Sequence, residues 1–282
     1  LPLLLMTWKV GPALACGNLG TPVLEAVQAA PKGATFVVEL SSYQLESVVA
    51  FHAEGAAFLN LTPDHLARHG TMETYRRTKL RIFEGQGPQD LRVGPASHPE
   101  LWADAPGAGR VAAFGWSPCE AWCDGEGQLR LHGEPLLHRS ELQIPGDHNV
   151  ENALAASLLA AHTGASLEGL RAGLRSYPGL AHRMVMCGEK GGVRAFNDSK
   201  GTNVDATLTA IRALPGPLVL LLGGTDKGTS YEPLREPLQG KLRKLIFLGE
   251  AIPRLVQDLG DLPHEVVPRF DDAVAAALGL AQ

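Results

Sequence analysis

The chain has 282 residues, of which 45% are hydrophobic and 20% charged, and its net charge at pH 7 is −5. This length and composition predict a globular protein of about two domains. The acidic balance, without a basic stripe, argues against a nucleic-acid-binding protein, and the apolar run Leu1–Met6 is far shorter than the roughly 20 residues that a membrane helix needs.

In the first part of the chain, short β-branched and aromatic runs alternate with helical patterns. The residues from Gly85 to Ile144 are different, because glycine, proline and tryptophan become frequent there and predict an irregular sheet or a β-rich flap. The strands predicted in this part span residues 35–40, 56–61, 110–114 and 128–132, and the helices span residues 73–83, 149–162 and 166–177.

A second unit is expected from Gly179 onward, because Pro178-Gly179 ends the preceding helix. Its strands and helices alternate in a βαβ order, which predicts a parallel sheet covered by helices on both faces. The strands are predicted at residues 193–196, 218–222, 244–248 and 264–267, and the helices at residues 204–214, 251–259 and 271–280.

Four polar clusters follow apolar strands, and most of them lead into a helix. Open α/β sheets bind ligands at the carboxyl ends of their strands, so one shared crevice is expected. The clusters are Glu39-Leu40-Ser41-Ser42-Tyr43-Gln44, Asn60-Leu61-Thr62-Pro63-Asp64-His65, Asn197-Asp198-Ser199-Lys200-Gly201-Thr202-Asn203 and Gly223-Gly224-Thr225-Asp226-Lys227-Gly228.

Glu39 and His65 are the metal-binding candidates of the first two clusters. A carboxylate and an imidazole there could hold Mg²⁺ beside nucleotide phosphates, with the carboxylate as the commoner ligand. The alternative is that Glu39 caps the next helix and that His65 is an ordinary surface histidine.

The later clusters offer groups for anions and nucleotides. Asp198 and Lys200 could bind a nucleotide and an anion, or form a turn in which the aspartate caps a helix. Lys227, in a glycine-rich loop, could hold a carboxylate or phosphate, or be a solvated turn lysine. Asn149 and Asn152 lie three residues apart at a predicted helix start, so they share a face, and capping explains only the first.

In this order, the clusters and the segments between them resemble the Mur ligase family. Eight ordered segments from about Ala15 onward carry the resemblance. They are GNLGTPVLEA at Gly17, VVELSSYQLE at Val37, LNLTPDHLARHG at Leu59, YRRTKLRIF at Tyr75, PGDHNVENALAA at Pro145, GLAHRM at Gly179, FNDSKGTN at Phe196 and LLLGGTDKG at Leu220.

The resemblance implies a fold, a reaction and a location. Residues 1–178 would form a central, parallel-sheet ATPase-like domain with a β-rich flap, and residues 179–282 a Rossmann-like domain. The implied enzyme is a cytoplasmic, monomeric ATP- and Mg²⁺-dependent amide ligase of peptidoglycan precursor synthesis. The ELSSYQL segment favours the member that adds D-glutamate to UDP-N-acetylmuramoyl-L-alanine through an acyl phosphate. Four scattered cysteines agree with a reducing cytoplasm.

The resemblance also implies residue roles. Glu39 and His65 would face Mg²⁺, and Lys79 would join them as a carbamylated, carboxylate-like ligand. The residues implied for ATP are Asn152, Arg183 and Asp198, those for the muramoyl substrate are Asn18, Ser41 and Gln44, and those for D-glutamate are Lys200, Thr202 and Lys227.

The sequence departs from the family pattern at its ends. It contains no match to the phosphate-binding motif G-x-x-x-x-G-K-[ST], and its only Gly-Lys pair, Gly240-Lys241, is followed by Leu242. The chain starts without Met, so we expect it to be incomplete at both ends. Two alternatives to the D-glutamate ligase stay open, namely an inactive fragment or binding module of the same fold, and another ligase of the superfamily such as a folylpolyglutamate synthase.

Overall fold

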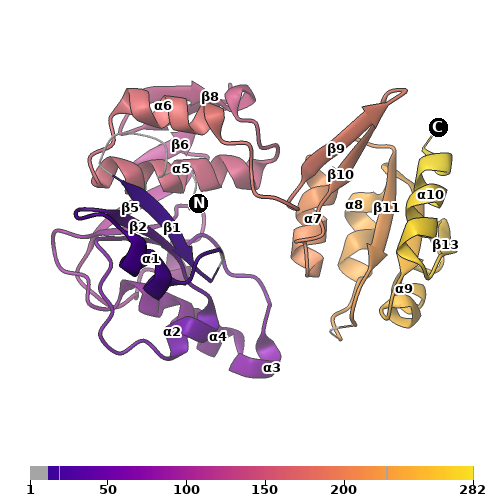
Figure 1. The fold of residues 1–282 in the computed structure, drawn as a ribbon, viewed down its shortest axis with the longest axis horizontal. Helices are drawn as coiled ribbons and strands as arrows, with labels where there is room; N and C mark the ends of the chain where they lie inside the picture. Colours follow the sequence, from indigo (N-terminus) through magenta and orange to yellow (C-terminus); the bar gives the residue numbers. More distant parts are fainter. Residues whose placement is uncertain (1–11, 19, 227, 282) are drawn as a thin grey trace. The chain divides into compact units, whose positions relative to one another are not determined.

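The computed structural model describes residues 12–18, 20–226 and 228–281 of the chain. These residues form two compact units, of which the first ends at Pro178 and the second begins at Gly179 (Figure 1). Both units combine helices with parallel strands, so the predicted α/β class is confirmed. Among the described residues, no helix is both long and apolar enough to cross a membrane.

The first unit contains two sheets. In the smaller sheet β1 (Ala13–Gly17) pairs in parallel with β2 (Thr35–Glu39), and α1 (Val23–Ala29) packs on β1. In the larger sheet six strands follow sequence order; the pairs from β3 to β6 are parallel and the last two pairs are antiparallel. Its strands are β3 (Gly55–Ala57), β4 (Leu91–Pro95), β5 (Arg110–Gly115), β6 (Ala121–Cys123), β7 (Gln128–Leu131) and β8 (Glu134–His138).

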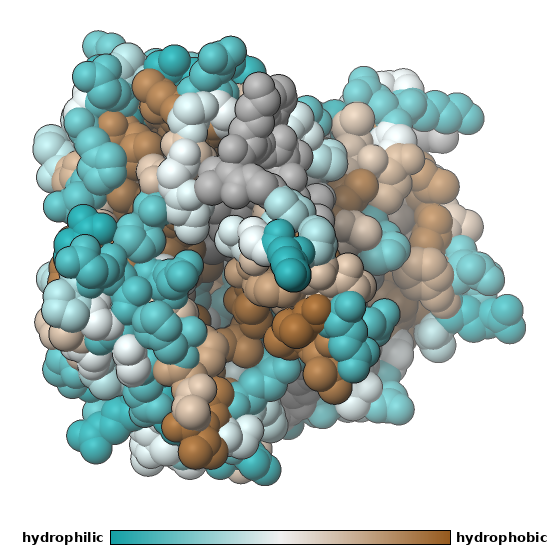
Figure 2. Space-filling model, turned by 60° about the vertical axis from the view of Figure 1, so that its left-hand side comes forward, coloured by the Kyte–Doolittle hydropathy of each residue, from teal (hydrophilic) through white to brown (hydrophobic). Residues whose placement is uncertain are grey.

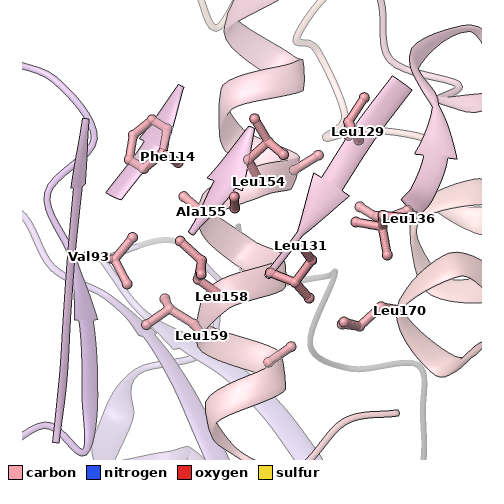
Figure 3. Packing of buried hydrophobic residues seen from close by; sticks show 14 of the residues in the cluster. Val93, Phe114, Leu129, Leu131, Leu136, Leu154, Ala155, Leu158, Leu159 and Leu170 are labelled. Carbon is pink, nitrogen blue, oxygen red and sulfur yellow. The ribbon is translucent and has the colours of Figure 1, made fainter. Parts of the chain in front are cut away.

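The main core of the first unit lies between the larger sheet and α5 (Asp147–His162). This helix is rich in alanine and leucine and is buried on several sides, because it contacts both the sheet and α6 (Leu167–Ser176). Leu154 and Leu158 are buried on α5, among the sheet side chains that Figure 3 shows, such as Phe114 and Leu131. Each fully buried leucine contributes about 2 kcal/mol of hydrophobic stabilisation.

Short helices follow β2 and β3 in the chain and carry several candidate residues. They are α2 (Ser42–Glu46), α3 (Leu66–His69) and α4 (Met72–Leu80), which continues into the 3₁₀ helix η1 (Arg81–Phe83). The Thr71 side chain caps α4 by accepting a hydrogen bond from the Thr74 N–H at 3.1 Å. The helix predicted at residues 73–83 is therefore confirmed. Two further 3₁₀ turns are η2 (Pro99–Leu101) and η3 (Arg139–Glu141).

The second unit consists of a hairpin and a parallel sheet. The hairpin pairs β9 (Val185–Lys190) with β10 (Val193–Asn197), and the sheet has the order β11-β12-β13. Helices α9 and α10 pack on β12, and α10 also contacts β11. The remaining bounds are β11 (Leu218–Gly223), β12 (Leu242–Leu248), β13 (His264–Val266), α7 (Val204–Ala213), η4 (Glu232–Leu234), α8 (Arg235–Leu238), α9 (Ile252–Leu259) and α10 (Phe270–Leu280).

The region from Gly85 to Ile144, predicted as an irregular sheet or a β-rich flap, forms β4 to β8 of the larger sheet. Three other predictions about these elements were wrong in detail. The strand expected at residues 56–61 pairs only as Gly55–Ala57, and the polar residues that follow leave the sheet. The strand at residues 193–196 pairs antiparallel with β9 and not with the parallel sheet. Helix α5 begins at Asp147 after the N-cap Gly146, so Asn149 does not cap it.

Hydrophobic side chains also reach the surface. Figure 2 shows hydrophobic patches between hydrophilic side chains on the face in view. On α1, Leu24 is 71% exposed and Val27 is 51% exposed. These two side chains lie three residues apart on one face of α1. Leu24 serves below as a reference for the buried leucines.

Candidate active site

Glu39 is the last residue of β2, at the carboxyl end of the strand where the sequence predicted it. Strand pairing places it opposite Gly17, and the Asn18 N–H donates to the Glu39 carbonyl oxygen at 2.8 Å. The side-chain Oε2 of Glu39 is buried and has no hydrogen-bond partner within the part of the chain that the structure describes. A buried carboxylate oxygen without a partner costs free energy until a donor or cation satisfies it, so this atom fits a metal or ligand site.

The close approach of Gly17 to Glu39 gives a first prediction. Gly17 has a φ of +117°, and a Cβ there would lie 2.2 Å from the Glu39 carbonyl oxygen. We expect Gly17→Ala to lower the free energy of unfolding by at least about 2 kcal/mol, because a strained backbone conformation alone costs about 1–3 kcal/mol. Urea denaturation measures this loss.

The matched control for this prediction is Gly20→Ala. Gly20 also has a positive φ, +79°, but a Cβ there would meet nothing within 4 Å. We expect this substitution to lower the free energy of unfolding by only about 1 kcal/mol, because the positive φ is its sole cost. Equal losses for the two variants would show that contact with the Glu39 backbone is not what requires glycine at position 17.

Ser41 and Gln44 cap α2 reciprocally. The Gln44 N–H donates to Ser41 Oγ at 3.3 Å, and the Ser41 N–H donates to Gln44 Oε1 at 2.9 Å. The Ser41 hydroxyl also donates to Gln44 Oε1 at 3.2 Å. This capping box explains the local sequence, because it satisfies two backbone donors at a helix start. Both predicted substrate residues are therefore fixed in orientation next to Glu39.

His65 lies directly before α3, in a left-handed conformation with a φ of 54°. A left-handed backbone is uncommon for a residue other than glycine and occurs often at functional sites. Its Nδ1 is 3.4 Å from the Tyr43 hydroxyl oxygen, and the two rings meet edge to face at 5.0 Å. The other ring nitrogen, Nε2, is 3.6 Å from Asp64 Oδ2. Contacts at both ring nitrogens therefore fix the orientation of the imidazole.

Lys79 is a largely buried cation on α4. Its Nζ donates to the Asn60 carbonyl oxygen at 2.6 Å and lies 5.1 Å from the Phe58 ring centre and 5.4 Å from the Tyr75 ring centre. Burial lowers the pKa of Lys79 to about 8, although the charge of Asp64 opposes the shift. A lysine of this kind carries a substantial neutral, nucleophilic fraction near neutral pH.

The structure brings His65 and Lys79 together around one tyrosine. The His65 and Tyr75 ring centres are 6.4 Å apart, and Lys79 Nζ lies over the same Tyr75 ring. Helix α2, which follows Glu39, packs against α4, which carries Lys79. Across the described residues, no three His, Cys, Asp or Glu side chains already form a metal site. Metal binding at Glu39 and His65 would thus need donors of another kind, such as ligand phosphates.

Asn149 and Asn152 share a face of α5, as predicted. Asn149 Nδ2 donates to the Pro145 carbonyl oxygen at 2.7 Å, and Asn152 Nδ2 lies 3.4 Å from Asn149 Oδ1. The Asn149 side chain therefore binds the loop before α5 and does not cap the helix. This contact positions the second asparagine near the start of α5.

In the second unit, Asp198 is held by the segment that contains Arg183. The Met184 N–H donates to Asp198 Oδ1 at 3.0 Å, and the Lys200 N–H donates to the His182 carbonyl oxygen at 3.0 Å. Burial raises the pKa of Asp198, against the opposing effects of the Met184 N–H and the Arg183 charge. The structure thus groups three predicted residues, Arg183, Asp198 and Lys200.

The last two predicted residues of this unit have different outcomes. Thr202 lies directly before Asn203, whose side chain caps α7 by accepting from the Ala206 N–H at 2.8 Å. Lys227 lies outside the described residues. Its neighbour Asp226 accepts from the Gly228 N–H at 2.8 Å and pairs with Arg254 at 2.9 Å, and these two contacts lower the pKa of Asp226.

Comparison with known proteins places this geometry in a family. The family model described as the Mur ligase middle domain matches residues 18–160. This chain belongs to the Mur ligase family. A UDP-N-acetylmuramoylalanine–D-glutamate ligase of Chromohalobacter salexigens is 44% identical over 92% of the chain, and one of Thermoanaerobacter pseudethanolicus is 37% identical over 85%. The Mur ligase chain spans 58% and 54% of the length of these two relatives.

Solved structures show the same fold. MurF from Acinetobacter baumannii matches this Mur ligase with a TM-score of 0.67 at 17% identity, over 95% of the chain and 69% of its own. A folylpolyglutamate synthase from Mycobacterium tuberculosis matches with a TM-score of 0.68 at 15% identity, over 91% of the chain and 63% of its own.

Sequence reasoning missed three residues that organise the first unit of this Mur ligase, namely Tyr43, His69 and Tyr75. The His69 ring contacts the rings of Tyr43 and Tyr75, and both tyrosine rings also contact His65. Tyr75 sits four residues before Lys79, on the same helix face, which is the one signal that the sequence offered. Tyr43 and His69 are separated by 26 positions, so only the tertiary fold joins them.

Proposed function

We propose that this Mur ligase chain provides the ATP-binding and ligase portions of an enzyme that adds D-glutamate to UDP-N-acetylmuramoyl-L-alanine. The observation that carries the proposal is that relatives with this name match nearly the whole chain, at 44% and 37% identity. The buried Oε2 of Glu39, which has no hydrogen-bond partner among the described residues, and the largely buried Lys79 support it, because an ATP-dependent ligase needs groups that hold Mg²⁺ beside phosphates.

In this proposal Glu39, His65 and carbamylated Lys79 face Mg²⁺. The neutral Lys79 amine attacks the carbon of CO₂ and loses a proton, which replaces a cation with an anionic carbamate. With a pKa of about 8, roughly a quarter of the amine is neutral at pH 7.5, against about one part in a thousand for an ordinary lysine. Bound Mg²⁺ would neutralise charge on the transferred phosphoryl group.

The remaining roles follow from the residue groups described above. Residues of the first unit, Asn18, Ser41 and Gln44, bind the muramoyl substrate, and Asn152 binds ATP. In the second unit, which we propose to be Rossmann-like, Arg183 and Asp198 bind ATP. Three residues of that unit bind D-glutamate: Lys200, Thr202 and Lys227. We further propose that the enzyme acts as a monomer in the cytoplasm.

The proposed reaction has two steps. A carboxylate oxygen of the substrate attacks the γ-phosphorus of ATP, so that ADP leaves and an acyl phosphate forms. The D-glutamate amine then attacks the acyl carbon, phosphate leaves and the nitrogen loses a proton, which completes the amide. Excluding water protects the acyl phosphate from hydrolysis.

Phosphate release by the purified protein tests the proposal. We expect release only when ATP, UDP-N-acetylmuramoyl-L-alanine and D-glutamate are all present, and a loss of at least about 100-fold for Glu39→Gln, the scale of a lost electrostatic contact to a transition state. The control is Glu25→Gln, which changes an exposed glutamate on α1. Equal release with other amino acids would refute the D-glutamate assignment.

The folylpolyglutamate synthase fold match motivates a second candidate. A ligase of that kind would release phosphate with a reduced folate and glutamate in place of the muramoyl nucleotide. Folate-dependent release in the same assay would replace the first proposal with this one. Binding of ATP without release under either condition would support the binding-module alternative.

A further inference from the structure

One buried histidine of the first unit is not used by the proposed reaction. The His69 side chain is only 1% exposed, and both of its ring nitrogens have partners on α2. Nε2 lies 3.0 Å from Ser42 Oγ, and Nδ1 lies 3.2 Å from Glu46 Oε1. The ring also stacks on Tyr75, with ring centres 5.0 Å apart and planes inclined by 27°. His69 therefore connects three helices, α2, α3 and α4.

The hydrogen-bond directions in this chain of groups follow from Glu46. Arg68 donates from Nη2 to Glu46 Oε2 at 2.7 Å, and this bond lowers the pKa of the carboxyl. An ionised carboxylate only accepts, so the 3.2 Å ion-pair contact with Glu46 is favourable only when His69 Nδ1 carries a hydrogen. In the neutral ring Nε2 then accepts from the Ser42 hydroxyl. The result is a directed chain from hydroxyl to imidazole to carboxylate, anchored by a guanidinium.

This chain lies between the two segments that carry the metal-facing candidates. Ser42 is the first residue of α2, three residues after Glu39, and Glu46 is the last. His69 is the last residue of α3, four residues after His65, and its stacking partner Tyr75 also contacts Lys79 Nζ. The hydrogen bond to Ser42 and the ion-pair contact with Glu46 thus place His69 against the start and the end of α2.

We propose that His69 is a positioning residue, whose hydrogen bond to Ser42 and ion-pair contact with Glu46 hold the Glu39 segment in register with His65 and Lys79. The proposal rests on the proposed function for its effect on turnover, but these two contacts themselves do not. Partners that orient metal-facing groups typically affect metal affinity or activity by about 10- to 100-fold. His69→Phe keeps a ring beside Tyr75 but loses the hydrogen bond to Ser42 and the ion-pair contact with Glu46, and we expect its effect to fall in that range.

The test uses the purified protein with three variants. For His69→Phe we expect the Mg²⁺ concentration for half-maximal phosphate release to rise by about 10-fold or more. His69→Gln keeps an amide that can donate to Glu46 and accept from Ser42, and we expect it to recover most of the loss. The control is His52→Phe, because His52 also pairs with a carboxylate, that of Asp90 at 2.7 Å, and neither residue has a role in the proposed site. A shift for His52→Phe as large as that for His69→Phe would overturn the proposal, as would an unchanged Mg²⁺ requirement in His69→Phe.

A spectroscopic measurement separates this proposal from the proposed function. In ¹⁵N-resolved NMR spectra of the imidazoles, we expect His69 to carry its hydrogen on Nδ1 and to exchange it slowly with water. A hydrogen on Nε2 would overturn the proposal even in an active enzyme, and the expected tautomer would support the chain of bonds even if no ligase activity were found. Covalent labelling of Ser42 by a fluorophosphonate would show an activated nucleophile and would also overturn the positioning role.

Discussion

Relative to Lys79→Met, the wild-type protein is expected to gain about 3 kcal/mol of unfolding free energy between pH 7 and pH 10.5. The pKa of Lys79 is about 8 in the folded protein, whereas an ordinary lysine has a pKa near 10.5. Below pH 8 both states are protonated, so the folded state bears the full cost of a buried cation. Between these two values the unfolded chain keeps the proton that the folded chain has lost, so stability rises with pH.

Urea denaturation of both proteins at several pH values, in buffer free of CO₂, measures this difference. The variant serves as the reference that removes the contributions of tyrosines and cysteines, which titrate in the same range. If the difference in unfolding free energy between the two proteins stayed constant from pH 7 to pH 10.5, Lys79 would not be a buried lysine with a lowered pKa. The same variant is expected to lack phosphate release, because methionine can be neither carbamylated nor charged.

Leu154→Ala is expected to lower the free energy of unfolding of the first unit by about 3–4 kcal/mol. Leu154 is fully buried on α5 in the main core, and large-to-small changes at such positions combine lost hydrophobic transfer with a cavity. The higher helix propensity of alanine offsets only a few tenths of a kcal/mol. Chemical denaturation followed by a signal from the first unit measures the loss.

Leu24→Ala is the matched control for this substitution. Leu24 is also on a helix, α1, but it is 71% exposed, so we expect a change within about 0.5 kcal/mol. If both variants lost the same stability, the buried position of Leu154 would not be the cause. If neither variant lost stability, α5 would not be part of the core that unfolds cooperatively.

The strand and helix pattern was predictable where local physics determines it. The β-branched run of β2 and the amphipathic pattern of α6 were recognised, because burial of one face imposes a period on the sequence. Strand β1 was not predicted, since Ala13–Gly17 has small residues of low strand propensity and is a strand through its pairing with β2. The partner of β10 was also missed, because a short apolar run does not specify a parallel or antiparallel neighbour.

The candidate site, too, could be predicted from the sequence only in part. Glu39 could be located from sequence because it follows a recognisable strand and precedes a helix start. The ring cluster of Tyr43, His65, His69 and Tyr75 could not, because its members meet only after α2, α3 and α4 have packed. The left-handed backbone of His65 was not predicted either: histidine is enriched among the non-glycine residues that adopt it, but such residues are uncommon, so the residue type alone does not locate one.

The reciprocal capping of α2 has a consequence for ligand selection. Backbone N–H groups only donate, so the bond from the Ser41 N–H fixes which atom of the Gln44 amide is the oxygen. With that oxygen engaged, the group that Gln44 can offer to a ligand is its NH₂, a pure donor. A molecule that binds at this position would therefore need an acceptor there, such as a carbonyl, carboxylate, phosphate or hydroxyl oxygen, and one presenting an ammonium group would leave two donors facing each other.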